Sequence, residues 1–134
     1  MPFPPIHHTL ICELAKAEGS GKLSALGMFG IAPSVTIGVL DLTKPVDLTF
    51  VLFGGSGDGH HDMSFEIVGP NGQPVFQAPP AIGVDVPPTR ATVSLVMKVN
   101  PTFPAVGQYT IRLLVDGAVH YEERFEIAQG PIIP

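Results

Sequence analysis

The chain has 134 residues, a length that suits one domain of common size. Hydrophobic residues make up 45% of it and charged residues 14%, a balance that excludes an intrinsically disordered chain. The formal net charge is −5 and the seven Lys and Arg residues are scattered, so we expect neither a nucleic-acid partner nor an anionic membrane target. We predict one domain over 1–134, with a proline-rich arm at 1–6 and a tail at 130–134.

The N-terminal segment and the cysteine content indicate the compartment. Residues 1–6 hold three prolines and no Lys or Arg, which does not suit a signal peptide. Cys12 is the only cysteine, so no intrachain disulfide can form, and this favours a reducing compartment. We therefore expect a cytoplasmic protein, and no motif in the chain indicates a cofactor.

The segment from Thr9 to Glu18 can be read in two ways. Its residues favour helix, with Thr9 as a possible N-cap and Gly19 as a possible C-terminal cap. Read as a strand, it places Leu10, Cys12 and Leu14 on one face. We predict the strand, because the rest of the chain requires sheet partners and because a resemblance described below also implies it.

The stretch from Leu23 to Leu40 carries no charge and has about the length of a short membrane span. Gly27, Gly30, Pro33 and Gly38 interrupt it, which favours two short strands over one helix. We therefore predict no membrane span.

Two strands are expected in the middle of the chain. Val46 to Phe53 is apolar on both faces, as in a strand buried on both sides, and Met63 to Ile67 alternates apolar and polar residues. Between them, Gly54 to Asp62 is expected to be a glycine-rich hairpin loop. After a short run at 74–77, prolines 79, 80, 87 and 88 predict an extended connection.

The C-terminal half shows the clearest alternation. Apolar residues recur at every second position in 91–99, in 109–115 and in 119–127, which predicts three strands. Asp116-Gly117 suits the tight turn of a hairpin between the last two. In the last strand, Val119 and Tyr121 are expected to point inward. Glu123 also falls on the inward set, so we expect either a bulge or a wet sheet edge there.

These elements predict an all-β fold, a two-layer antiparallel β-sandwich of about seven to nine strands. The chain has no Trp, so the expected core is built from Phe50, Phe65, Phe125 and aliphatic residues.

Both ends of the chain carry short motifs: Cys12-Glu13-x-Ala15, Gly21-Lys22-Leu23 and Gly27-x-Phe29 at the start, then Gly107-x-Tyr109 and Val115-Asp116-Gly117. With them the chain resembles a family of short bacterial proteins of unknown function. The resemblance implies a cytoplasmic sandwich of Ig-like or C2-like type and supplies no activity. Gly107-x-Tyr109 also resembles the tyrosine corner of immunoglobulin-type sandwiches, in which the Tyr hydroxyl bonds to upstream backbone; the alternative is a Tyr that only packs.

Two stretches contain residues that could carry chemistry. In Gly54–Asp62, the side chains of Asp58, His60 and Asp62 would share one side of an extended chain, and this donor set can hold a divalent metal. They also continue the outward face of the next strand, which is the structural alternative. Adjacent His60 and His61 would point apart. Cys12 could be a nucleophile if a histidine lay near it, but a lone Cys between leucines is typical of a core.

We therefore expect a non-catalytic protein-binding or structural module, with a protein partner or self-association through the uncharged stretch Leu23–Leu40. A sandwich that binds a metal or a sugar through the Gly54–Asp62 loop is the alternative, and a Cys12-based enzyme is a third.

Overall fold

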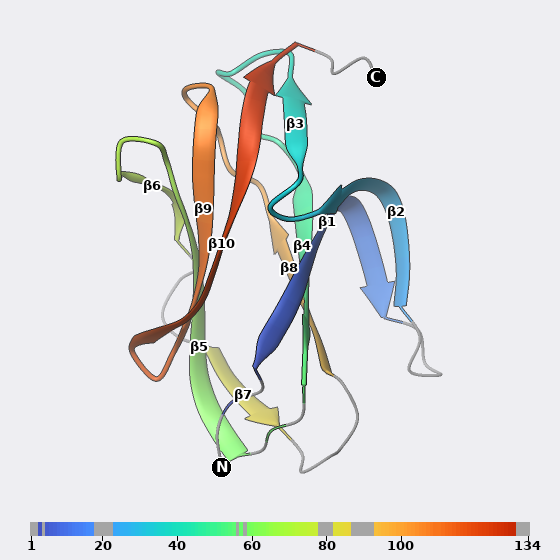
Figure 1. Cartoon of the computed structure of the whole chain (residues 1–134), viewed down its shortest axis with the longest axis vertical. Helices are drawn as coiled ribbons and strands as arrows, with labels where there is room; N and C mark the ends of the chain where they lie inside the picture. Colours follow the sequence, from blue (N-terminus) through green and yellow to red (C-terminus); the bar gives the residue numbers. More distant parts are fainter. Residues whose placement is uncertain are drawn as a thin grey trace.

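The computed structural model describes residues 3, 5–17, 23–55, 57, 59–77, 82–86 and 93–130, and within them every regular element is a β-strand. The strands form two sheets (Figure 1). Sheet A has the order β2 (Leu23–Ile31), β1 (Ile6–Ala17), β4 (Leu48–Gly54), β8 (Val93–Val99). Sheet B has the order β3 (Thr36–Val39), β10 (Ala118–Gln129), β9 (Gly107–Val115), β5 (Gly59–Val68), β6 (Pro74–Gln77), and β7 (Ile82–Val86) also pairs with β5.

The all-β prediction is confirmed, with ten strands in the described residues rather than seven to nine. The additional strand is β7, which lies where we expected an extended connection between prolines. It forms because β5 begins at Gly59, earlier than expected, and residues 59–63 pair with it. The pairing is also not wholly antiparallel, because β3 runs parallel to β10.

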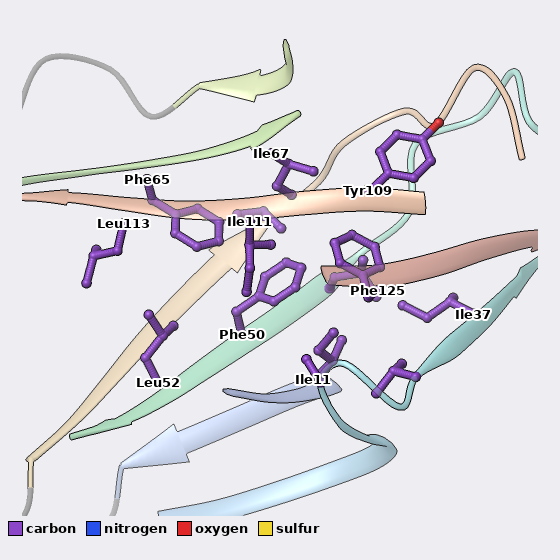
Figure 2. Packing of buried hydrophobic residues seen from close by; sticks show 14 of the residues in the cluster. Ile11, Ile37, Phe50, Leu52, Phe65, Ile67, Tyr109, Ile111, Leu113 and Phe125 are labelled. Carbon is purple, nitrogen blue, oxygen red and sulfur yellow. The ribbon is translucent and has the colours of Figure 1, made fainter. Parts of the chain in front are cut away.

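The core lies between the two sheets and is formed by the side chains at every second position of the strands. On β9, Tyr109, Ile111, Leu113 and Val115 are buried. The predicted aromatic core of Phe50, Phe65 and Phe125 is confirmed: Phe50 of sheet A contacts both Phe65 and Phe125 of sheet B, with ring centroids 5.4 and 5.7 Å apart (Figure 2). Each such pair adds about 0.5–1.5 kcal/mol beyond the burial of its area.

Phe103 is a core residue that the sequence pattern did not reveal, because it lies in the irregular loop before β9. It is fully buried and packs edge-on against Tyr109, with ring centroids 5.0 Å apart. The Tyr109 hydroxyl donates a hydrogen bond to the Ala105 carbonyl, 2.6 Å away. Of the two interpretations of Tyr109, bonding to upstream backbone is therefore confirmed. Burial raises the pKa of its hydroxyl, and the Ala105 bond opposes this shift.

The last strand differs from the expected alternation at one place. A bulge between Val119 and Tyr121 pairs Val119 with Leu114 and Tyr121 with Leu113. Val119 therefore leaves the inward set and is half exposed, so its predicted inward orientation is wrong. Because of this extra residue, Glu123 pairs with Ile111 of β9. The Glu123 side chain is partly exposed there, and its carboxylate accepts a hydrogen bond from the Arg124 backbone N–H.

The strand interpretation of Thr9–Glu18 is confirmed up to Ala17, and Glu18 lies outside the described residues. The two strands predicted in Leu23–Leu40 are β2 and β3. The described residues contain no helix of the length and apolarity that crossing a membrane would require. At the N-terminal arm, Ile6 belongs to β1 and Phe3 is buried; at the tail, residues 131–134 lie outside the description.

Candidate functional site

The end of β1 and the start of β2 form a two-stranded extension of sheet A. The pairing between β1 and β4 ends at Cys12 opposite Thr49, whereas β1 continues to Ala17. Beyond that point, residues 14–17 pair with residues 23–26 of β2. We call these two segments the ribbon. In Figure 1 this hairpin bends away from β4 at the side of the molecule. Both long edges of the ribbon are therefore open within the described part of the chain.

Two irregularities in β2 mark the base of the ribbon. Gly27 has φ +64°, and the register then shifts so that Phe29 is an extra residue between Met28, opposite Cys12, and Gly30, opposite Ile11. Bulges of this kind bend a strand and increase its twist.

Gly27 combines a positive φ with close contact to the Glu13 side chain. A Cβ added to Gly27 would lie 2.7 Å from Glu13 Cδ, so the acidic side chain lies directly over the glycine. The Cys12-Glu13 and Gly27-x-Phe29 motifs are thus neighbours in space and form one structural feature. An L-residue at this positive φ would also be strained.

The edge strands of the two sheets differ in how they are protected. Proteins commonly protect sheet edges from pairing with other chains by short strands, charged residues or proline. β8 carries the exposed Lys98, β7 contains Asp85, β6 begins with Pro74, and β3 has four residues. β2 has nine residues and no charged side chain. Of the described edges, β2 is therefore the one protected by neither charge, proline nor shortness. The protection that it does have is the bend at its base, with Gly27 and the bulge at Phe29.

Exposed apolar side chains accompany this edge. Phe29 and Ile31, both on β2, are 37% and 46% exposed to solvent. The other large exposed apolar residues in the description, Leu40, Val106 and Val119, lie on separate elements. Scattered single apolar residues are normal on a protein surface, so the pair on one open edge is the feature of interest.

The second apolar face of β4 is not part of this surface. Val51 is fully buried and forms a separate cluster with Leu10 and Cys12, with Phe53 and Val96 packed against it. The prediction that Val46–Phe53 is buried on both sides is confirmed for β4. Most of this face is covered within the chain itself, since Leu10, Cys12 and Val51 are buried and Phe53 and Val96 are partly buried.

Cys12 lies inside that second cluster. Its side chain is fully buried and its thiol lies 3.7 Å from the Thr49 carbonyl oxygen, which accepts a weak hydrogen bond from it. His7 and His8 are on the same strand but exposed, five and four residues away. A thiol in this position is a small core group.

The metal candidates lie on a strand and not in the expected loop, because β5 begins at Gly59. His60 Nε2 and Asp62 Oδ1 lie 3.8 Å apart on the exposed side, and Asp58 lies outside the described residues. No group of three His, Cys, Asp or Glu side chains that could hold a metal occurs in the part of the chain that the structure describes. The expected opposite orientation of His60 and His61 is confirmed: their side chains are 64% and 12% exposed.

Asp116 binds His61 and fixes the end of β5. Its carboxylate lies 2.9 Å from His61 Nδ1 and accepts the Asp62 backbone N–H at 2.9 Å. The His61 contact, and then the Asp62 N–H, lower the pKa of Asp116. The Phe3 ring packs edge-on against both His61 and His120, with centroids 5.4 and 5.2 Å away. The cluster thus attaches the N-terminal arm to sheet B, a role that sequence spacing could not reveal.

A small hollow of about 220 Å³ lies beside Tyr109 at the other end of the sandwich. Its lining is uncharged and includes Pro70, Pro74, Pro104 and Val106. Tyr109 is the titratable residue in this lining, and its hydroxyl already bonds to Ala105, so the hollow supplies no acid–base pair.

Comparisons with known proteins give a family and little more. A family described as "Family of unknown function (DUF6941)" matches residues 7–128, including the middle of the chain that the motifs leave uncovered. No curated protein matches the chain. Among solved structures, the chain is similar to the Pseudomonas fluorescens alkylpurine DNA glycosylase AlkC bound to DNA containing an abasic site analog. The identity is 17% and the TM-score 0.42, and the alignment covers 72% of this chain and 28% of the glycosylase. A likeness this low carries no inference about function.

Proposed function

We propose that this chain, which belongs to the DUF6941 family of unknown function, is a non-catalytic module that binds protein by accepting a strand at the open edge of β2. The observation that carries the proposal is the nine-residue, uncharged edge of β2 with Phe29 and Ile31 exposed on it. An edge strand presents unpaired N–H and C=O groups, and an incoming strand satisfies them. Main-chain bonds supply the affinity, and the side chains beside them supply the specificity.

The architecture that we propose for the module is Ig-like. The support is the Tyr109–Ala105 hydrogen bond, which has the form of a tyrosine corner at the start of a strand. The core lies between two sheets and uses Phe50, Phe65 and Phe125, since the chain contains no Trp. We also propose a bacterial, cytoplasmic setting, on the resemblance of the terminal motifs and on the buried Cys12, the only cysteine in the sequence.

The non-catalytic part of the proposal rests on Cys12, the strongest nucleophile candidate in the chain. A nucleophile must reach its substrate, and this thiol is fully buried. In the folded protein we expect a thiol reagent such as DTNB to react with Cys12 only at the rate of unfolding. Rapid, stoichiometric labelling of the native protein would contradict this part.

A synthetic strand tests the binding proposal directly. The probe is a fluorescent peptide of residues 6–17 with Cys12→Ser, because this segment is the strand that β2 already pairs with on its other side. We expect the peptide to bind the wild-type protein, measured by fluorescence anisotropy. Ala25→Lys places a charge on the open edge, in the part of β2 that belongs to the ribbon, and should weaken binding at least about tenfold.

Val119→Lys is the matched control, because it adds the same charge at an exposed apolar position on sheet B. It should leave the affinity unchanged. The proposal is wrong if the wild-type protein does not bind the peptide, or if Ala25→Lys and Val119→Lys bind it equally.

A further inference from the structure

We infer that the strand received by β2 is β2 of a second copy of this chain, running antiparallel across a two-fold axis. This inference rests on the proposed function and names its partner. It would join the two four-stranded sheets A edge to edge, in the order β8-β4-β1-β2 followed by β2-β1-β4-β8 of the partner. The contact would be isologous, with the same strand contributed by both copies.

Self-complementarity is the first reason for choosing a second copy. In a two-fold antiparallel pair, residues near the axis meet their own counterparts, and like charges directly opposite each other are destabilising. Residues 23–40 contain no charged residue, so β2 can meet itself without any such pair. β8, which carries Lys98, does not meet this condition.

The charge of the rest of the molecule is the second reason. The chain carries a net charge of −5, so two copies repel each other on average. The outward face of sheet B carries charges of both signs, including the Glu66–Arg112–Glu122 ion pairs. β2 itself carries no charge, and the acidic group that the structure places beside it is Glu13 of β1, over Gly27 at the base of the ribbon. Two copies that meet along β2 therefore bring no like charges directly opposite each other.

The open ribbon is the third reason. A two-stranded ribbon is marginally stable in water, and three or more strands give independent stability. Residues 14–17 and 23–26 pair with each other beyond the end of the β1–β4 register. Pairing with a second ribbon gives four strands at this point, so dimer formation and ordering of the ribbon stabilise each other.

We place the two-fold axis beside Ala25, close to the middle of the β2 part of the ribbon, so that residues 23–27 pair with their counterparts and Phe29 and Ile31 lie beyond the paired stretch. The experiment uses charge pairing at Ala25. We expect the wild-type protein to be a dimer by light scattering at micromolar concentration. Ala25→Lys alone and Ala25→Glu alone should each give monomers, because each puts like charges across the axis. An equimolar mixture of the two should recover the mixed dimer, identified by its mass in native mass spectrometry. Val119→Lys and Val119→Glu are the controls and should remain dimeric.

A second variant does not depend on the charged variants folding well. Cys12 is buried, so Ala25→Cys adds one reactive thiol on the edge, and mild oxidation should link two copies through it. Disulfides need Cα atoms within about 7 Å, a distance that residues close to the two-fold axis satisfy. Val119→Cys is the control and should not cross-link.

The outcomes separate the inference from the proposed function. A wild-type protein that is monomeric at all concentrations, or a dimer that Ala25→Lys and Ala25→Glu leave intact, overturns the inference. If the monomer still binds the 6–17 peptide at β2, the proposed function stands with a different partner. If it binds no peptide either, both are wrong.

Discussion

At the scale of single residues, Tyr109 connects the core to the loop that precedes its own strand. Its ring packs against Phe103 and Phe125, and its hydroxyl reaches the Ala105 carbonyl. The sequence could suggest this role because the Gly-x-Tyr spacing is local. It could not suggest Phe103, whose burial depends on residues far away in the chain.

Tyr109→Phe removes the hydroxyl and leaves the Ala105 carbonyl without this donor. We expect the free energy of unfolding to fall by about 1–2 kcal/mol, because the aromatic packing is retained and one partly buried hydrogen bond is lost. Urea denaturation measures this, with an unchanged slope as the sign that the folded state stays compact. No loss of stability would contradict the role of the hydroxyl.

Asp116 makes stability depend on acid pH. Its pKa in the folded protein is lowered from 3.8, chiefly by the hydrogen bond with His61. The stabilisation is therefore present above the unfolded pKa and is lost as pH falls through the lower folded pKa. In Asp116→Asn we expect a flatter dependence of stability on pH below about pH 4. Thermal unfolding between about pH 2 and 6 measures it, and identical slopes in both proteins would disprove the coupling.

Phe3 is the residue that attaches the arm. Its ring lies between His61 and His120 and is almost fully buried. Phe3→Ala should lower the free energy of unfolding by about 3 kcal/mol, the low end for a buried Phe, and should make the bond before Ile6 more sensitive to proteases. Phe3→Leu is the control, with a smaller loss. Unchanged stability and proteolysis in Phe3→Ala would mean that the arm is not held there.

At the scale of elements, β1 shows where local preference and tertiary context disagree. Thr9–Ala17 has good helix formers, yet it is a strand because both β2 and β4 pair with it. The strand was predicted from the need of the other strands for partners and from the family resemblance of the terminal motifs, and not from local preference. β7 and the bulge at Val119 were not predictable in the same way, because each depends on the register of a neighbour: β5 for β7, and β9 for the bulge.

The bend at Gly27 is the element-scale feature that the motifs specify. Gly27→Ala should cost about 1–2 kcal/mol, because the residue has a positive φ and its new Cβ would meet the Glu13 side chain. In a Glu13→Ala background the cost should be smaller, since only the strain of φ remains. A double-mutant cycle by denaturation measures the difference. Additive losses would show that Glu13 does not lie over Gly27 in solution.

At the scale of the whole molecule, the alternation of apolar and polar residues predicts the sandwich. The proposed site is a sheet edge that no other strand in the described part of the chain pairs with. Apolar residues at every second position of β5 and β9 predict a sheet with one buried face, and such a face packs against a second layer. The strand order, and therefore which strands are edges, comes from long-range pairing that no local pattern encodes. The uncharged stretch Leu23–Leu40 was recognisable in the sequence as a candidate surface. That its first half is an open edge required the structure.

The metal candidates illustrate the same limit. The shared orientation of His60 and Asp62 was predictable from the period of two, but their position on a paired strand beside β7 was not. Whether Asp58 joins them stays a prediction, and calorimetric titration with zinc and calcium tests it. The absence of a heat of binding with both metals would exclude that alternative.

Amide hydrogen exchange of β2 as a function of protein concentration is the most direct test of the proposed role of its edge. We expect the outward-facing amides of residues 23–26 to gain protection as the concentration rises, while β9 and β10 in sheet B exchange at constant rates. Protection in 23–26 that is the same at every concentration, and that the 6–17 peptide does not change, would contradict a strand-accepting edge.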